Sequence, residues 1–376
     1  MTDWHARIQR TQHLVRALAH LGHRCIFVNP HLGRQFPSTP LRDRVPRLSA
    51  VEENVFELHV RLPREPVFHC RMLRTGEVAA IESAVDTALT ALGTRRAVQV
   101  VSFPLWYPVA DRLRRRAGYP LIYDCHDYLA GFTNVSRDVV CAEEESIEGA
   151  DIVIVSSQEL LDRHGRRPGQ TMLVRNAVDY EHFQTAESGT VPRPVAGYIG
   201  ALDWWFDVES IERAARENVG CDFVLAGRTE HPSVECLAKL PNVKLLGEVP
   251  YAELPALMAR FTVGLIPFRV SDFTRAANPI KLYEYFSRGI PVVSSRLPEV
   301  DLMNDLVYTY NDPSQCGSQL SRAVAEDDPL RQARRRQTAR CESWAARASA
   351  ISLEIQARWP EDPVRSEGPP SDCAVS

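Results

Sequence analysis

A lysine and a glutamate three residues apart, Lys281 and Glu284, carry the clearest chemical signal in this sequence. They fall in a stretch that predicts a short helix over residues 279–289, because proline is tolerated in a helix's first turn and glycine is favoured just past its end. Side chains three residues apart share a helix face, and a helix N-terminus attracts anions. A lysine there adds to a phosphate site, and a glutamate one turn later can accept hydrogen bonds from a sugar diol. The pair points to a nucleotide, with an ordinary solvated Lys–Glu pair as the alternative.

The elements that must position this helix alternate between short apolar strands and helices. Apolar runs of this length suit strands buried on both faces, so the pattern predicts parallel sheets covered by helices. With 376 residues and 44% apolar content, the chain is long enough for two domains. The expected fold class is α/β, with two doubly wound parallel-sheet domains. Strands are expected at 24–29, 55–62, 97–103, 121–124, 152–156, 195–199, 222–226, 243–246, 263–267, 290–294 and 306–310.

Residues 278–294 read Asn-Pro-Ile-Lys-Leu-Tyr-Glu-Tyr-Phe-Ser-Arg-Gly-Ile-Pro-Val-Val-Ser. This segment resembles the donor-binding signature P-x-K-x-x-E-[YF]-x-x-x-G-x-P-V-V of GT-B glycosyltransferases, above all the large family 4, or glycosyl transferases group 1. The resemblance implies the GT-B fold, in which two Rossmann-like domains face a cleft. It also implies transfer of a sugar from a nucleoside-diphosphate sugar to an acceptor hydroxyl. By the same resemblance, Glu284 would hold the ribose hydroxyls and Lys281 the diphosphate.

The same family pattern divides the chain into domains. We expect an acceptor-side Rossmann-like domain at 1–183, a linker at 184–194 and a nucleotide-sugar-binding Rossmann-like domain at 195–340. A helix at 341–359, which contains the family's S-W-x-x-R pattern, would cross back to the first domain. The Pro-, Ser- and Gly-rich tail at 360–376 is expected to be disordered.

The N-terminus is unusual. Residues 7–13 resemble the R-x-Q segment that opens the first helix in a subgroup whose members also read G-x-x-x-x-W-[FI]-D. In those proteins a strand and a loop precede this helix, whereas this chain begins at the loop, with Trp4. We therefore expect the first, central strand to be missing, so that either the true start lies upstream or the sheet is completed differently.

Further donor contacts are expected where strands end. Gly200 follows one strand, Arg269 follows another, and Arg275 lies in the loop before the donor helix. Ligands in open α/β sheets collect outside the carboxyl ends of the strands. A guanidinium fork suits phosphate oxygens, and glycine lets the backbone approach them closely. Solvated arginines and a simple glycine turn are the alternatives.

One further loop resembles the family pattern, and two places depart from it. Residues 245–250 resemble the G-x-[VL] loop, which would set Gly247 and Val249 against the nucleobase, although a common strand-to-helix turn is the alternative. Ala276 stands where family members usually have a glutamate that contacts a sugar hydroxyl. Residues 201–207 lack the usual basic pair after Gly200, which shifts the phosphate contacts to Lys281 and the arginines.

On the acceptor side, His126 and Asp127 close a strand of the first domain, and the resemblance implies that they point toward the cleft. Asp127 could be the general base that deprotonates the acceptor, and His126 could contact the donor sugar. A capping aspartate and a buried structural histidine are the alternatives. Trp204 and Trp205 could wall the cleft or stack on a sugar ring, or one of them could belong to the core.

Composition narrows the class of protein. A net charge of −4 and a pI near 6.3 disfavour a nucleic-acid binder. Nine scattered cysteines without a C-x-x-C pair, and the lack of an apolar run long enough to span a membrane, suit a cytoplasmic protein. The arginines within 112–116 are a candidate peripheral contact with the inner membrane face, or a solvated helix end. No convincing metal motif is present, so we expect a metal-independent enzyme with no cofactor beyond a UDP- or GDP-type donor.

Two other functions remain open at this point. A nucleotide-sugar epimerase shares the architecture, although the Tyr-Glu-Tyr segment at 283–285 fits transferases better. A nucleotide-sugar-binding partner without catalysis fits the missing strand and Ala276. The acceptor could be a glycan, a lipid-linked intermediate or a secondary metabolite, and the oligomeric state is open.

Overall fold

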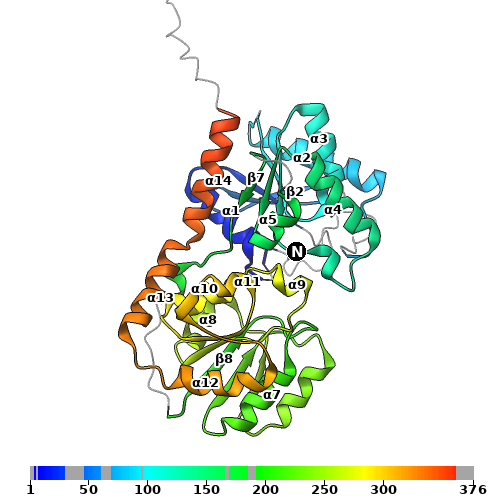
Figure 1. Cartoon of the computed structure of the whole chain (residues 1–376). Helices are drawn as coiled ribbons and strands as arrows, with labels where there is room; N and C mark the ends of the chain where they lie inside the picture. The colour runs from blue at the N-terminus through cyan, green and yellow to red at the C-terminus, as the bar shows by residue number, and fades with distance from the viewer. Residues whose placement is uncertain are drawn as a thin grey trace, which may run out of the picture.

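Two α/β domains lie one above the other, and the last helices of the chain run along both (Figure 1). The structure is a computed structural model. The residues that it describes are 4–5, 7–29, 46–60, 69–94, 96–165, 169–184 and 192–360.

The C-terminal domain is built on one six-stranded parallel sheet of order β10-β9-β8-β11-β12-β13. Most of its strand residues are buried and apolar, as expected for strands covered by helices on both faces. The prediction of a doubly wound α/β domain is confirmed here. The strands are β8 (Val195–Ile199), β9 (Asp222–Ala226), β10 (Val243–Gly247), β11 (Val263–Ile266), β12 (Val292–Ser295) and β13 (Val307–Tyr310).

Helices and short 3₁₀ segments connect these strands. One expected helix, at 233–239, is instead the 3₁₀ segment η3, since it starts at Pro232 and Pro241 forces the preceding Leu240 into an extended conformation. The segments are α7 (Val208–Glu217), η3 (Pro232–Lys239), η4 (Tyr251–Glu253), α8 (Leu254–Met258), α9 (Asp272–Arg275), α10 (Ile280–Ser287), α11 (Pro298–Asp301), η5 (Asn304–Leu306), η6 (Pro313–Gln315), α12 (Cys316–Val324) and α13 (Pro329–Cys341).

The N-terminal domain contains two separate sheets. In the first, β1 (Cys25–Val28) pairs in parallel with β3 (Val55–His59), and β2 (Arg47–Glu52) pairs antiparallel with β3. The second is fully parallel, with order β4-β5-β6-β7. Within the described ranges no ladder joins β1 to β4, so the domain has no continuous central sheet there. The second sheet consists of β4 (Gln99–Val101), β5 (Leu121–Cys125), β6 (Ile152–Val155) and β7 (Thr171–Leu173).

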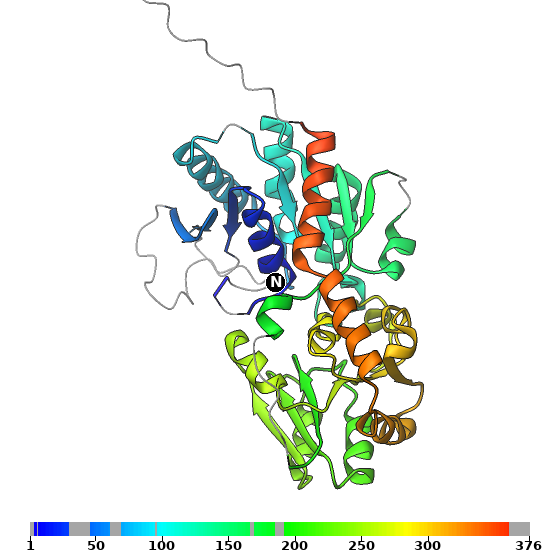
Figure 2. The ribbon, with the colours of Figure 1, turned by 90° about the vertical axis from the view of Figure 1, so that its left-hand side faces the viewer.

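The helices of the N-terminal domain cover these sheets (Figure 2). They are α1 (Arg10–His20), α2 (Thr75–Ala91), η1 (Pro104–Trp106), α3 (Tyr107–Ala117), η2 (Leu129–Gly131), α4 (Arg137–Gly149) and α5 (Gln158–His164). The short helix α6 (Tyr180–Gln184) packs instead on α8 and α10 of the C-terminal domain.

The chain returns to the N-terminal domain through its last helix, α14 (Trp344–Arg358), which packs along α1 (Figure 2). The His13 and Trp344 rings stack with centroids 5.0 Å apart and planes 7° from parallel. The preceding helix, α13, packs against α10. The last two helices therefore connect the domains: α14 packs on the N-terminal domain, and α13 packs on α10, the predicted donor helix. Among the described residues, no helix is long and apolar enough to cross a membrane.

Candidate functional site

The predicted donor helix is α10, which begins at Ile280 and ends just before Arg288. Pro279 precedes its first residue, and Gly289, with a φ of +74°, lies beyond its C-cap, as the sequence indicated. Together with α9 and α11, α10 lies on the side of the C-terminal domain that faces the N-terminal domain (Figure 1). A ligand at its first turn would therefore lie between the two domains.

The Lys281 side chain is packed against aromatic rings. Its Nζ lies 4.7 Å from the centroid of the Phe268 ring and 5.1 Å from that of Tyr198. Burial lowers the pKa of this ammonium to about 8, against the opposing influence of the nearby Glu284. Across the described part of the chain, no carboxylate forms an ion pair with it. Lys281 is thus a cation at the start of a helix, and the nearby carboxylate of Glu284, one turn later, does not form an ion pair with it.

Glu284 is buried, with only 8% of its surface exposed, whereas Lys281 is partly exposed. Burial raises the pKa of its carboxyl group to about 7, and the Lys281 charge opposes the shift. Its carboxylate forms no hydrogen bond or ion pair with any residue that the structure describes. By contrast, the buried Glu299 accepts a 2.7 Å hydrogen bond from Asn278. Since unpaired buried charge is costly, this arrangement fits a site that a ligand completes.

Three glycines follow neighbouring strands at the edge next to Lys281. A Cβ atom placed on Gly200 would lie 3.2 Å from the Lys281 Cε, so the end of β8 touches the lysine. A Cβ atom on Gly227, after β9, would overlap the Gly200 carbonyl oxygen. The Gly227 amide donates to the Gly247 carbonyl, 2.7 Å away, at the end of β10. The strand ends thus expose backbone without side chains, as a close approach by phosphate or a nucleobase requires.

Sequence reasoning selected Gly200 and Gly247 but missed Gly227. The signal was available, because Gly227 follows the strand β9 (Asp222–Ala226) as directly as Gly200 follows β8. Its φ of +154° and its contact with Gly200 both require glycine.

The loop after β10 carries the other predicted nucleobase contact. Val249 packs on the core of the C-terminal domain. The neighbouring Glu248 forms an ion pair with Arg7 of the N-terminal domain, at 2.5 Å. The loop therefore lies at the boundary between the domains, as a base-binding role requires, and the roles of Gly247 and Val249 stay predictions.

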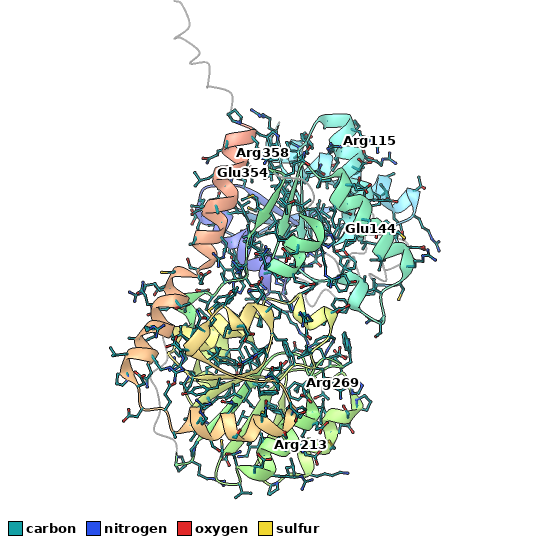
Figure 3. The ribbon with its side chains drawn as sticks, in the orientation of Figure 1. Arg115, Glu144, Arg213, Arg269, Glu354 and Arg358 are labelled. Atoms are coloured by element: carbon teal, nitrogen blue, oxygen red, sulfur yellow. The ribbon has the colours of Figure 1, made fainter. Side chains whose placement is uncertain are left out.

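The predicted phosphate-binding arginines are less closely tied to α10. Arg269 and Arg275 are both exposed, and Arg269 lies at the periphery of the C-terminal domain (Figure 3). Neither guanidinium forms a hydrogen bond or ion pair within the described ranges. The structure therefore brings Gly200, Lys281 and Glu284 together, whereas a role for either arginine stays a prediction.

The predicted acceptor-side residues lie next to a contact between the domains. The His126 carbonyl accepts a 2.9 Å hydrogen bond from Ser156, and the adjacent Ser157 hydroxyl donates to the Ala276 carbonyl at 2.7 Å. The His126 Nε2 lies 3.6 Å from a carboxylate oxygen of Asp127, which is 42% exposed. The pair is accessible at the boundary, and its catalytic role stays a prediction.

Ala276, which replaces the family's sugar-binding glutamate, is fully buried. Its side chain belongs to an apolar cluster whose other buried members, among them Tyr123 and Cys125, come from the N-terminal domain. A glutamate would have to place its carboxylate in this apolar contact. In this protein the position therefore serves to join the domains.

The two tryptophans belong to an aromatic cluster that spans the boundary. The Phe273 ring lies 5.3 Å from Trp204, 5.5 Å from Trp205 and 4.4 Å from Phe132 of the N-terminal domain. Both tryptophans are partly exposed. They thus lie at the domain boundary and not deep in one core.

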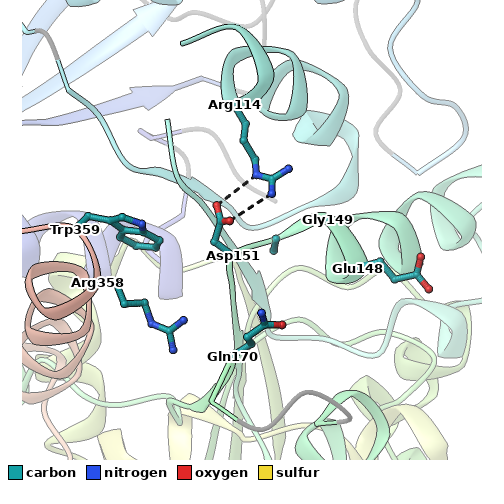
Figure 4. Close-up of a pocket in the computed structure, with 8 residues that line it drawn as sticks. Arg114, Glu148, Gly149, Asp151, Gln170, Arg358 and Trp359 are labelled. Carbon is teal, nitrogen blue, oxygen red and sulfur yellow. Dashed lines mark hydrogen bonds and ion pairs between the residues drawn. The ribbon is translucent and has the colours of Figure 1, made fainter. Parts of the chain in front are cut away.

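A cavity of about 530 Å³ lies elsewhere, in the N-terminal domain (Figure 4). Its lining includes Asp151 and Gln170, which immediately precede β6 and β7. The cavity is therefore at the amino ends of those strands, opposite the edge where ligands of α/β sheets collect. Its Arg114 is already paired with Asp151 at 3.4 Å. We do not assign the donor to it.

The arginine cluster of α3 is also neutralised locally. Each of its four guanidinium groups forms an ion pair with an acidic side chain of the same domain: Arg112 with Glu82, Arg114 with Asp151, Arg115 with Asp111, and Arg116 with Glu82 and Asp86. The predicted membrane contact stays a prediction.

Within the described ranges, no group of three or more His, Cys, Asp or Glu side chains is arranged to hold a metal ion.

The chain has two α/β domains, and the start of α10 and the glycine-lined strand ends lie at the boundary between them. This is the arrangement of the GT-B class of fold. Residues 193–326 match the family model described as "Glycosyl transferases group 1". TuaH of Bacillus subtilis (strain 168), described as a teichuronic acid biosynthesis glycosyltransferase, is 30% identical over 217 residues. That match covers 50% of this chain and 54% of TuaH, so the chain spans about half the length of this curated relative.

Solved structures show the same fold. Sucrose-phosphate synthase from Thermosynechococcus elongatus superposes with a TM-score of 0.70 at 17% identity, over 93% of this chain and 92% of that chain. HepE of Anabaena, solved with UDP and glucose, superposes with a TM-score of 0.58 at 16% identity, over 81% and 85%. The resemblance to GT-B glycosyltransferases of group 1, drawn above from residues 278–294, is confirmed.

Proposed function

We propose that this protein is a glycosyltransferase that moves a sugar from a nucleoside-diphosphate sugar to an acceptor hydroxyl. The observation that carries the proposal is the pair on α10: the Glu284 carboxylate is buried, the Lys281 cation is partly buried, and neither has an ion-pair partner among the described residues. A nucleotide supplies what both lack, because a diphosphate brings anions to the ammonium and a ribose diol brings two hydroxyl donors to the carboxylate.

The chemistry requires the departing diphosphate to be stabilised as its charge develops. Lys281 supplies a full positive charge, and the first amides of α10 add the positive end of the helix dipole. Gly200, at the end of β8, places backbone without a side chain of its own next to the Lys281 ammonium, where phosphate oxygens could approach both. His126 and Asp127 lie at the opposite face of the boundary, where the acceptor hydroxyl would lose its proton.

For the donor we propose a UDP- or GDP-sugar and would test UDP-sugars first. The matching structure of HepE contains UDP and glucose, which supports this order. No cofactor is needed for the transfer beyond the donor itself.

The test incubates the purified protein with UDP- and GDP-sugars without an acceptor and follows release of the nucleoside diphosphate. A transferase releases it slowly by donor hydrolysis, and Glu284→Ala removes that activity. An isomerised donor would instead indicate an epimerase. Tight nucleotide binding with no turnover, even after candidate acceptors are added, would indicate a non-catalytic binding protein.

A further inference from the structure

Two buried asparagines meet across the domain boundary just before the donor helix. Asn176 lies in the segment that follows β7, and Asn278 stands two residues before the first residue of α10. The Asn176 backbone N–H donates to the Asn278 side-chain oxygen at 3.0 Å, and the Asn176 side-chain nitrogen donates to the Asn278 backbone carbonyl at 2.6 Å. Only 8% and 4% of the two residues are exposed. These two hydrogen bonds fix the backbone at Asn278 against the backbone at Asn176.

The N-terminal domain anchors one side of this pair. The Arg10 guanidinium donates to the Asn176 side-chain oxygen at 3.0 Å. The same guanidinium pairs with Asp124, on β5, at 2.8 Å, and both charged side chains are almost fully buried. Hydrogen bonds that involve charged groups are the stronger ones. Asn176 is therefore held by α1 and β5 of the acceptor-side domain.

The C-terminal domain anchors the other side. The Asn278 side-chain nitrogen donates to the Glu299 carboxylate at 2.7 Å and to the Tyr283 hydroxyl, on α10 itself, at 3.0 Å. Glu299 also accepts hydrogen bonds from Arg175 and from the Gln158 backbone amide, each at 2.8 Å. Asn278 is thus the point at which bonds from both domains and from α10 converge.

We infer that Asn278 and Asn176 form a positioning pair that sets where α10 presents the donor relative to the acceptor-side domain. This inference rests on the proposed function. The nucleotide contacts proposed above, Lys281, Glu284 and Gly200, all belong to the C-terminal domain, whereas the acceptor lies against the N-terminal domain. The pair therefore governs alignment of the reacting groups and not the grip on the nucleotide. A misplacement of about 1 Å can lower a rate about 100-fold.

The test exploits the direction of the hydrogen bond between Asn278 and Glu299. Asn278→Asp removes the donor and sets two carboxylates against each other. We expect turnover of a UDP-sugar to fall by at least about tenfold, while the dissociation constant for UDP changes by less than about twofold. Adding Glu299→Gln removes the repulsion and returns a donor to the pair, with its direction reversed. The double variant is expected to recover part of the lost turnover, because the Glu299 oxygen that accepts from Asn278 also accepts from Arg175.

Asn242→Asp is the matched control. Asn242 is equally buried and donates to three backbone carbonyls within the C-terminal domain, away from the boundary. We expect it to lower stability without changing turnover by the folded protein. If Asn278→Asp instead weakens UDP binding and lowers stability with turnover preserved, or if the double variant does not recover, Asn278 has only a structural role and the inference fails.

Small-angle scattering separates this inference from the proposed function, because it requires no turnover. We expect wild type and the Asn278→Asp/Glu299→Gln variant to give one scattering curve, and Asn278→Asp alone to give a more extended particle. Identical curves for all three together with unchanged turnover in Asn278→Asp would overturn the positioning role, whereas absence of turnover in wild type would overturn the proposed function.

Discussion

The end of β8 and the start of the donor helix meet at Gly200 and Lys281. A Cβ atom on Gly200 would lie 3.3 Å from the Lys281 Nζ, and the Gly200 φ of +139° already disfavours any other residue. The ammonium is thus held directly over side-chain-free backbone. Phosphate oxygens placed there would contact the lysine and approach the strand-end backbone at once.

Gly200→Ala is therefore expected to weaken UDP binding. The new methyl group must push the Lys281 side chain aside, and the backbone conformation costs about 1–3 kcal/mol for a residue with a side chain. Calorimetric titration with UDP and thermal unfolding measure the two effects. Gly220→Ala is the control, because a Cβ atom there meets nothing within 4 Å. Equal UDP affinities for the two variants would contradict the placement of phosphate beside Gly200.

Lys281→Met keeps the apolar stem against Phe268 and Tyr198 and removes the charge. We expect UDP affinity to fall while the free energy of unfolding stays equal or rises, since partly desolvating an ammonium without an ion-pair partner is unfavourable. Because the pKa of Lys281 is lowered to about 8, the wild-type affinity for UDP should decline as the pH rises through about 8. The variant should lack that decline. A wild-type affinity that is flat between pH 7 and 9 would argue against contact of Lys281 with the diphosphate.

The raised pKa of Glu284 predicts how stability depends on pH. The pKa of its carboxyl group rises from the usual 4.5 to about 7 on folding. Between these two pH values the folded state therefore binds more protons than the unfolded state. The free energy of unfolding therefore falls as the pH rises from about 4.5 to about 7. Glu284→Gln should remove this group's share of the slope, at most about 3 kcal/mol. Urea unfolding at pH 5 and pH 8 measures the difference.

Glu143→Gln provides the control for this measurement. Glu143 is buried in the N-terminal domain, where it accepts a hydrogen bond from Tyr123 at 3.1 Å, and burial raises its pKa to about 8. Glu143→Gln should likewise reduce the pH dependence of the free energy of unfolding, without changing the affinity for UDP. If Glu284→Gln leaves the pH dependence of stability as in wild type, its carboxylate is not desolvated as described.

The donor helix and its strand ends could be predicted from sequence because their signals are local. Pro279 and Gly289 bound α10 within a few residues, and Lys281 and Glu284 follow from helical spacing. Gly200 stands directly after an apolar strand, and the same signal was overlooked at Gly227.

The contacts between domains could not be predicted, since they join residues far apart in the chain. Asn176 and Asn278 are 102 positions apart, and nothing in the sequence of either segment indicates that the two pair. For the same reason Ala276 was read only as a lost sugar contact, although its surface is buried against the N-terminal domain. Strand-end position also made Arg269 and Arg275 candidates for the phosphate, because it does not reveal which side chains turn outward.

The central claim is that Glu284 holds the ribose of a nucleotide, and calorimetric titration of UDP into wild type and Glu284→Ala tests it most directly. Glu209→Ala, on the exposed face of α7, serves as the comparison. We predict that Glu284→Ala weakens UDP binding by about 1.5–3 kcal/mol, the scale of hydrogen bonds to a charged group, while Glu209→Ala leaves it unchanged. Folded Glu284→Ala protein that binds UDP as tightly as wild type would contradict the account.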